Sequence, residues 1–364
     1  MTRRDYLTTS VLALSGFALS EVRGNAEGAK HSLRARLSLN ENPFGPSQLA
    51  LAAIQEQFGE LYRYVDNGAD VLTPAIVERE GISADQIALG EILEAMGLHL
   101  ATNGPSGGEF IYSEPGYTAL VNAVGTGGGV VVGVPLNQDF QNDLAAIAAK
   151  VGARTRAIYL VNPHNPTGTV SDGAIFEAFV REISRRVTVI VDEAYLEFEP
   201  DFDRRTVVGL TRAGENVVVF RTFGKLYGLA GLSVGYAVTP KALAASLKRA
   251  GIGTPETLNR PALAAAAASL RDENYVTATR AKVTAERDKW NLLFDALKLR
   301  HSDARGNFVF FETGRPHHEV AEALLAKGIE IGRAFPPFDG WVRISIGLPE
   351  ENAVARTAIA ELLR

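Results

Sequence analysis

Lys225 is the group in this sequence best placed for covalent chemistry with a ligand. It lies in the glycine-rich segment 221–231, directly after an apolar run. Glycines leave the lysine amine room to reach a ligand, and functional groups are often carried on loops that a rigid scaffold positions. A lone lysine of this kind is more often structural or exposed to solvent, so its role depends on its neighbours.

Asp192 ends a second apolar run, at residues 187–191. Burial of an unpaired carboxylate costs several kcal/mol, so this position implies a cationic partner. A protonated pyridine nitrogen would meet that need. The alternatives are a helix N-cap and a metal ligand, although no companion ligands lie nearby. Tyr195, three residues later, could donate a hydrogen bond to a ligand oxygen or could simply belong to the core.

Three further segments offer groups that could bind the same ligand. Asn165 lies in the turn 162–168, where two prolines and a terminal glycine leave its amide free. Tyr117 could stack on an aromatic ring. Glu91 and Ile92 could open a helix whose amides bind phosphate. The cofactor pyridoxal 5'-phosphate, PLP, has four requirements of a protein. They are an amine for its aldehyde, an acid for its ring nitrogen, hydrogen-bond donors for its phenolate oxygen and a binding site for its phosphate.

Short apolar runs that alternate with helical stretches must position these groups. The expected strands cover residues 110–112, 130–132, 157–161, 187–191, 217–220 and 234–238. This pattern predicts an α/β fold with a mostly parallel sheet between helices. Asn162, Asp192 and Thr222 follow three of these runs, and ligands bind at the carboxyl ends of strands in open α/β sheets. We therefore expect the site at that edge.

The C-terminal part predicts a smaller α+β domain. Helices are expected at 262–270, 274–297, 318–327 and 350–363, with strands at 307–311 and 341–346. The long helix 274–297 would link two domains. The predicted division is a large PLP-binding domain at 61–250 and a small domain formed by 27–60 and 251–364.

Two arginines of the C-terminal part could bind substrate anions. Arg343 lies on an alternating strand and shares a face with Trp341 and Ser345, so it can point into the cleft between the domains. Its guanidinium could hold a carboxylate through two hydrogen bonds. Arg333 could serve a second substrate anion. A solvent-facing charge is the alternative interpretation of both.

Composition excludes several other classes of protein. The 37 Lys and Arg residues against 42 Asp and Glu give a net charge of -5, which leaves no basic surplus for nucleic acid. With no cysteine, the chain has no disulfide, thiol nucleophile or zinc thiolate site. No metal site is predicted.

The first 26 residues have the layout of a secretory signal. Arg3 and Arg4 precede an apolar run at 11–19, and small residues at 24–26 offer a cleavage site after Ala26. The run is shorter than the ~20 residues that span a bilayer, so no membrane span is predicted. The paired arginines resemble the twin-arginine type, which implies a periplasmic enzyme. The alternative is a cytoplasmic enzyme with an N-terminal extension.

Taken in order, the motifs resemble the histidinol-phosphate aminotransferase family of fold type I PLP enzymes. They are Asn-Glu-Asn-Pro-Phe-Gly at 40–45, Tyr-Arg-Tyr at 62–64, Asn-Pro-His-Asn-Pro-Thr-Gly at 162–168, Asp-Glu-Ala-Tyr at 192–195, Gly-Leu-Ala-Gly-Leu after Lys225, and Arg-Ile-Ser-Ile-Gly at 343–347. The resemblance covers residue ~38 to the C-terminus.

This resemblance assigns roles to individual residues. Lys225 would link covalently to the cofactor and move the proton, with Asp192 on the pyridinium, and Asn165 and Tyr195 on the phenolate. Arg343, with Arg333 and Asn42, would bind substrate. Tyr117 would cover the ring and Thr222 would bind the phosphate. Tyr64 would reach the phosphate of a neighbouring subunit, because the family implies a homodimer with shared active sites.

Three departures from the family fall around the ligands, and one of them is the replacement of the aromatic-Asn segment expected near 255–260 by Thr254-Pro255-Glu256-Thr257-Leu258-Asn259. The family usually has serine before the lysine and arginine eight residues after it, whereas this chain has Gly224 and Ser233. The loop at Gly90 is also shorter than the family's phosphate-binding loop. The predicted phosphate-binding site therefore lacks a hydroxyl group and a fixed positive charge that the family usually has.

The predicted function is transfer of an amino group to a 2-oxo acid such as 2-oxoglutarate. The donor would be an amino acid or amino-alcohol phosphate, histidinol-phosphate-like or aromatic. The alternatives are a PLP-dependent decarboxylase or racemase of the same fold, or a catalytically weak PLP-binding protein.

Overall fold

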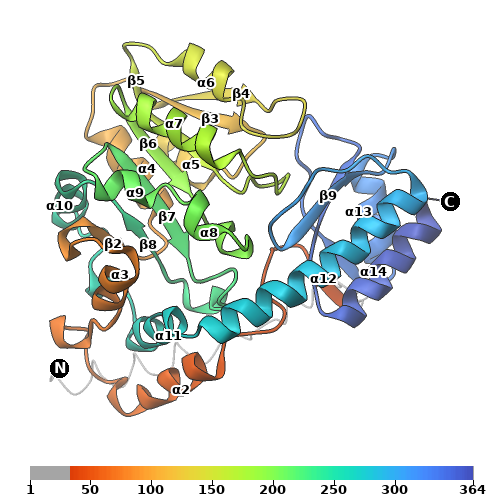
Figure 1. The fold of residues 1–364 in the computed structure, drawn as a ribbon, viewed down its shortest axis with the longest axis horizontal. Helices are drawn as coiled ribbons and strands as arrows, with labels where there is room; N and C mark the ends of the chain where they lie inside the picture. Colours follow the sequence, from red (N-terminus) through yellow and green to blue (C-terminus); the bar gives the residue numbers. More distant parts are fainter. Residues whose placement is uncertain (1–32, 364) are drawn as a thin grey trace, which may run out of the picture. The chain divides into compact units, whose positions relative to one another are not determined.

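A seven-stranded sheet forms the centre of the computed structural model, which describes residues 33–363 (Figure 1). The strand order is β2-β8-β7-β6-β5-β3-β4. Pairs from β7 to β4 are parallel, whereas β8 is antiparallel to β2 and β7. The bounds are β2 (Ile87–Leu89), β3 (Glu109–Glu114), β4 (Val130–Pro135), β5 (Thr155–Val161), β6 (Thr188–Asp192), β7 (Val217–Thr222) and β8 (Gly235–Val238). The predicted mostly parallel α/β fold is confirmed.

Alternate residues of each strand enter two separate hydrophobic cores. On β5, Ile158 and Leu160 join one core, while Tyr159 and Val161 join the other. Helices therefore cover both faces, which explains why the strands are apolar throughout. The first core includes residues of α2 (Gln48–Glu56), α3 (Leu72–Glu80), α6 (Leu144–Lys150), α7 (Gly173–Ser184), α9 (Val208–Arg212) and α11 (Arg260–Leu270), and the second includes α4 (Leu93–Thr102), α5 (Ala119–Thr126) and α10 (Lys241–Arg249).

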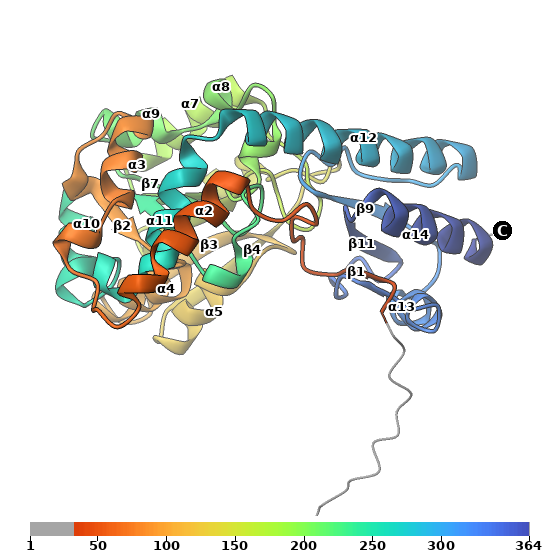
Figure 2. The same ribbon diagram turned by 90° about the horizontal axis from the view of Figure 1, so that it is seen from below.

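The C-terminal strands form two small sheets beside helices α12 to α14. In one sheet β9 pairs antiparallel with β11, and in the other β1 pairs parallel with β10. Helix α12 runs from the side of α11 to that of α14 (Figure 2). The bounds are β1 (Ala35–Leu37), β9 (Phe308–Glu312), β10 (Ile329–Ile331), β11 (Trp341–Ser345), α12 (Glu273–Leu297), α13 (His317–Leu325) and α14 (Pro349–Leu362); a short α8 (Phe202–Arg205) precedes α9. The predicted C-terminal elements are confirmed to within about three residues.

Strands β1, β2 and β10 were not predicted, because each spans three residues and shows no readable period. Helix α11 packs against both α2 and α3, and the described residues 33–363 form one compact unit. The division into domains at residues 61 and 250 thus stays a prediction, and the predicted signal at 1–26 lies outside the described residues. Between residues 33 and 363, no helix combines the length and the apolar character that crossing a membrane requires.

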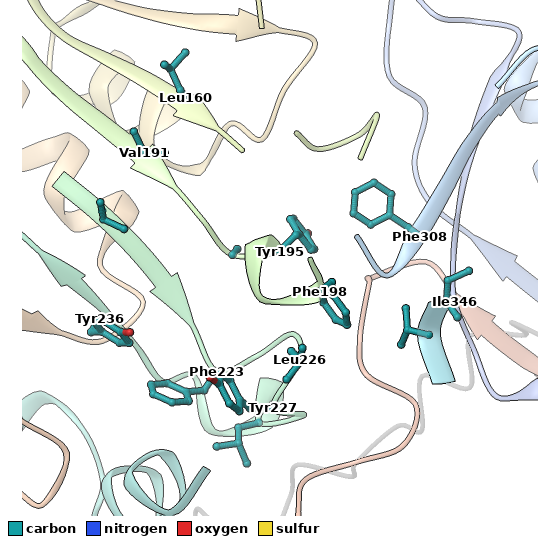
Figure 3. Packing of buried hydrophobic residues seen from close by; sticks show 14 of the residues in the cluster. Leu160, Val191, Tyr195, Phe198, Phe223, Leu226, Tyr227, Tyr236, Phe308 and Ile346 are labelled. Carbon is teal, nitrogen blue, oxygen red and sulfur yellow. The ribbon is translucent and has the colours of Figure 1, made fainter. Parts of the chain in front are cut away.

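An aromatic contact joins the C-terminal strands to the carboxyl edge of the large sheet. Tyr195 follows β6 and Phe308 begins β9, and their ring centroids lie 5.1 Å apart at an interplanar angle of 79°. Figure 3 shows both rings within the buried core, with Ile346 on the same side as Phe308. The segment that carries Tyr195 is therefore held by the large sheet on one side and by the C-terminal strands on the other.

A buried ion network lies behind the carboxyl end of β7. Arg221 is 2% exposed and pairs with Glu80 at 2.5 Å and with Glu193 at 3.0 Å. Tyr236 donates a hydrogen bond to Glu80 at 2.7 Å, and Thr206 donates to Glu193 at 2.8 Å. The charges are thus paired and hydrogen-bonded, which is the condition for burying them.

We expect Arg221→Met to lower the free energy of unfolding by about 3 to 5 kcal/mol, because it leaves two buried carboxylates without their cation. Urea denaturation followed by circular dichroism measures this loss. Arg181→Met is the control: Arg181 pairs with Glu177 on the surface, and its loss should cost less than about 1 kcal/mol. Equal losses in the two variants would contradict a structural role for the network.

Candidate active site

A cavity of about 420 Å³ lies where three parallel strands of the large sheet end. Val161 of β5, Asp192 of β6, and Phe220 and Thr222 of β7 line it. Lys225 and Tyr117 complete its walls from the loops after β7 and β3. The predicted position of the site, at the carboxyl edge, is therefore where the described residues form this cavity.

Lys225 projects from the turn that follows β7. Its Nζ donates a hydrogen bond to the carbonyl of Leu39 at 3.2 Å and lies 5.9 Å from the centroid of the Tyr195 ring. Gly228, later in the turn, has a φ of +72°, and a Cβ there would lie 2.6 Å from the backbone of Gly45. The turn therefore requires glycine to bring the N-terminal segment close to the lysine.

Asp192 is a buried carboxylate that makes no ion pair with any described residue. It accepts hydrogen bonds from the Tyr159 hydroxyl at 2.9 Å and from the Ala194 amide at 3.0 Å. Burial raises the pKa of Asp192 to about 6, although both hydrogen bonds and the charge of Lys225 oppose the rise. A cationic ligand group would remove this penalty, as the sequence predicts.

The Tyr195 hydroxyl is held at the junction of two cavities. It accepts hydrogen bonds from the side-chain amides of Asn40 at 3.2 Å and Asn165 at 3.4 Å. Tyr195, Tyr117 and Lys225 also line a second cavity of about 700 Å³ on the side of the C-terminal strands. Burial raises the pKa of Tyr117 to about 12, so its hydroxyl stays a neutral donor.

Arg343 presents a buried cation to the second cavity. It is 7% exposed and donates hydrogen bonds to Asn165 Oδ1 and to the Ser38 carbonyl, both at 2.7 Å. Its Nε has no partner, and it makes no ion pair among residues 33–363. Burial lowers the pKa of Arg343 to about 10, which makes the group receptive to an anion.

Arg333 lines the same cavity at a more open position. Its guanidinium lies 4.2 Å from the centroid of the Phe335 ring and donates to the Ala334 carbonyl. The positive charge of Arg333 also contributes to lowering the pKa of Arg343. The two arginines therefore create a positive field at one end of the cavity.

Three predicted residues do not reach the cavities through their side chains. Asn42 donates its amide to the Leu226 carbonyl at 2.7 Å and the Tyr275 hydroxyl at 2.8 Å, so it fixes the segment after Lys225 rather than facing a substrate. Ile92 packs into the second core. Tyr64 is 96% exposed on the surface.

Two residues of the site escaped the sequence-based prediction. Asn40 faces Tyr195, although its motif also contains Asn42 and gives no sign of which amide turns inward. Tyr159 supports Asp192 from the neighbouring strand, and a single hydroxyl within the apolar run 157–161 was the available signal.

The segment that leads into α4 forms part of the wall of the first cavity. Glu91 and Glu94 line the cavity together with Thr222, Gly224 and Ser233. The Thr222 hydroxyl donates a hydrogen bond to Glu91 and accepts one from the Gly224 amide at 2.9 Å. Thr222, predicted to bind phosphate, thus has an acidic neighbour.

The residues present fit PLP at the ring end of the cavity. The unpaired buried carboxylate of Asp192 suits a pyridinium, the Lys225 amine suits an aldehyde, and the Tyr195 hydroxyl suits a phenolate oxygen. Thr222 and the amides around Gly224 would hold the phosphate. Within residues 33–363, no cluster of His, Asp or Glu has the arrangement of a metal site.

Comparisons with known proteins agree with this geometry. The sequence profile of the family "Aminotransferase class I and II" matches residues 35–359. The histidinol-phosphate aminotransferase of Limosilactobacillus fermentum is 35% identical over 337 residues, 91% of each chain. The crystal structure of a putative histidinol-phosphate aminotransferase from Erwinia carotovora atroseptica has a TM-score of 0.84 and 30% identity over 90% of this chain and 95% of its own.

A further structure contains the cofactor. The histidinol-phosphate aminotransferase of Sinorhizobium meliloti, in complex with pyridoxal-5'-phosphate, has a TM-score of 0.83 and 28% identity over 92% of both chains. Both the profile match and the 35% identity extend over about nine tenths of the chain. The chain therefore belongs to the class I and II aminotransferase family, as a transaminase whose cofactor is PLP.

Proposed function

We propose that this transaminase moves an amino group from a histidinol-phosphate-like or aromatic donor to a 2-oxo acid such as 2-oxoglutarate. The observation that carries the proposal is that two buried charged groups make no ion pair among residues 33–363, namely Asp192 in one cavity and Arg343 in the adjoining one. Lys225 lines both cavities. The names of the relatives support the choice of donor.

Each residue then has a physical task. When bound, PLP supplies an aldehyde and an electron-withdrawing ring for amino-group transfer. Asp192 holds a negative charge that would pair with the ring nitrogen, and Tyr195 offers its hydroxyl to the ring oxygen. The Lys225 amine moves a proton to and from the substrate carbon, as a general base and acid. Arg343 binds the substrate anion and so orients the bond that is broken.

The enzyme should form glutamate from 2-oxoglutarate when given histidinol phosphate or an aromatic amino acid, without release of carbon dioxide. Lys225→Ala should lower this rate by at least about 10²- to 10⁴-fold, the usual contribution of a general acid or base. Reduction with borohydride followed by peptide mapping should place the cofactor on Lys225.

The control for this substitution is Lys241→Ala, because Lys241 pairs with Asp85 on the surface. Its rate should equal that of the unmodified enzyme. Cofactor label on Lys241 or Lys248 would remove the assignment of Lys225, and carbon dioxide release in place of glutamate would favour a decarboxylase.

Substitution of the two arginines should separate their roles. Arg343→Ala should raise KM and lower kcat for every donor, because a lost charge-assisted hydrogen bond costs about 1.5 to 3 kcal/mol, or about 10- to 150-fold in kcat/KM. Arg343→Lys should restore little, since lysine lacks the planar fork. Arg333→Ala should impair only donors with a second anionic group. Steady-state kinetics over a donor panel measures this split, and small uniform effects at both positions would mean that the anion is held elsewhere.

We also propose that the enzyme is a homodimer in which Tyr64 reaches the cofactor phosphate of the neighbouring subunit. Support comes from the family resemblance and from a cluster of exposed apolar side chains around Tyr64. These are Phe58 (59% exposed), Leu61 (61%) and Tyr62 (72%). Exposed apolar clusters of this kind mark interfaces between proteins.

A mixing experiment tests this shared site. Tyr64→Ala should weaken PLP binding, and Lys225→Ala should lack the covalent link. Dimers that contain one subunit of each kind should regain one complete site of their two, with the PLP affinity of the unmodified enzyme at that site and about half of its activity per dimer. Sedimentation should give the mass of a dimer. A monomer, or a mixture with no recovered activity, would contradict the proposal.

A further inference from the structure

Glu91 places a carboxyl group at the phosphate end of the cofactor cavity. Its Oε1 accepts a hydrogen bond from the Thr222 hydroxyl. The same oxygen lies against β8, where a Cβ added to Gly235, the register partner of Thr222, would lie 3.1 Å away. The acid is therefore held in the wall beside the hydroxyl that would bind the phosphate.

The charged residues that line the cavity disfavour the binding of a further anion there. The described lining holds three acids, Glu91, Glu94 and Asp192, and its one cation is Lys225. Gly224 and Ser233 contribute no charge. A phosphate ester carries close to two negative charges above its second pKa of about 6, so an ionised carboxyl group beside it repels it.

On the basis of the proposed function, we propose that Glu91 controls cofactor capture. In its neutral form it donates a hydrogen bond to the PLP phosphate, and in its ionised form it repels that phosphate. Binding of PLP then takes up one proton from solvent, which Glu91 carries for as long as the phosphate stays bound.

The titration of Glu91 falls in the range where this control operates. Although Glu91 is open to the cavity, desolvation of its carboxyl group by the surrounding protein raises its pKa to about 7; the hydrogen bond from Thr222 and the charge of Lys225 oppose the rise, and the charge of Asp192 adds to it. Glu94 on α4, Tyr117 and Tyr195 are the other titratable groups in the described lining of this cavity. A bound phosphate raises the pKa of Glu91 further by like-charge repulsion. PLP is thus held tightly below this pKa and progressively lost as pH rises through it.

Comparison of PLP with pyridoxal isolates the phosphate end. Pyridoxal lacks the phosphate but meets the same Lys225 and Asp192, so their titrations cancel in the ratio of the two Kd values. We expect the preference of the apoenzyme for PLP over pyridoxal to fall between pH 7 and 8.5, by up to about tenfold per pH unit for one linked proton. Absorbance titration of apoenzyme measures both constants.

In Glu91→Gln the carboxyl group cannot ionise. The variant should bind PLP about tenfold more tightly than the wild type at pH 8.5, with pyridoxal binding unchanged. Ionisation of the phosphate itself affects the wild type and the variant equally, so it drops out of this comparison. Calorimetry in two buffers of different ionisation enthalpy should show that, at pH 8, the wild type takes up about one proton more than Glu91→Gln on binding PLP, with equal proton exchange in the two on binding pyridoxal.

Glu94→Gln is the matched control, because Glu94 lines the same cavity but makes no hydrogen bond to Thr222. It should keep the pH dependence of the wild type. The same PLP preference in wild type and Glu91→Gln at every pH would overturn the inference. If the variant does not fold, the wild type alone still tests the inference. A PLP preference that does not change with pH, with no more proton uptake for PLP than for pyridoxal, would overturn it equally. Failure of the wild type to bind either compound would overturn the proposed function itself.

Discussion

A buried carboxylate without a cation sets the requirements of the whole site. Asp192 ends a strand that is apolar on both faces, and its backbone position is fixed because it pairs with Val161 of β5 in the parallel sheet. Its two hydrogen bonds, from Tyr159 and Ala194, compensate only part of the cost of burial. The folded chain therefore carries an unmet electrostatic demand, and a ligand with a cationic ring nitrogen satisfies it.

The second unmet demand has the opposite sign and comes from another part of the chain. Arg343 on β11 is buried and makes no ion pair with any residue from 33 to 363, although Asn165 and Ser38 accept hydrogen bonds from two of its nitrogens. Asn165 also contacts Tyr195, so one amide side chain links the arginine to the hydroxyl beside the first cavity. A cofactor cation at Asp192 and a substrate anion at Arg343 would together neutralise the site, and Lys225 lines both of the cavities concerned.

Neighbouring residues of β7 serve opposite faces of the sheet. Arg221 points into an ion network in which every charge has a partner, while Thr222 points into the cavity beside Glu91. The first arrangement stabilises the fold because it is complete. The second leaves a carboxyl group facing solvent and ligand, so its charge responds to pH and to what binds.

The sequence by itself determined the sheet, the long helices, and the lysine and aspartate at the strand ends, because these follow from local periodicity and from turn chemistry. It did not determine β1, β2 or β10, which exist only through pairing with distant strands. Nor did the sequence decide whether Asn40 or Asn42 turns its amide toward Tyr195, since that orientation depends on contacts with residues more than 150 positions away. The meeting of Glu91 with Thr222 was likewise decided by the tertiary structure alone, because it requires the start of α4 to pack beside the end of β7, and no local pattern encodes that distance.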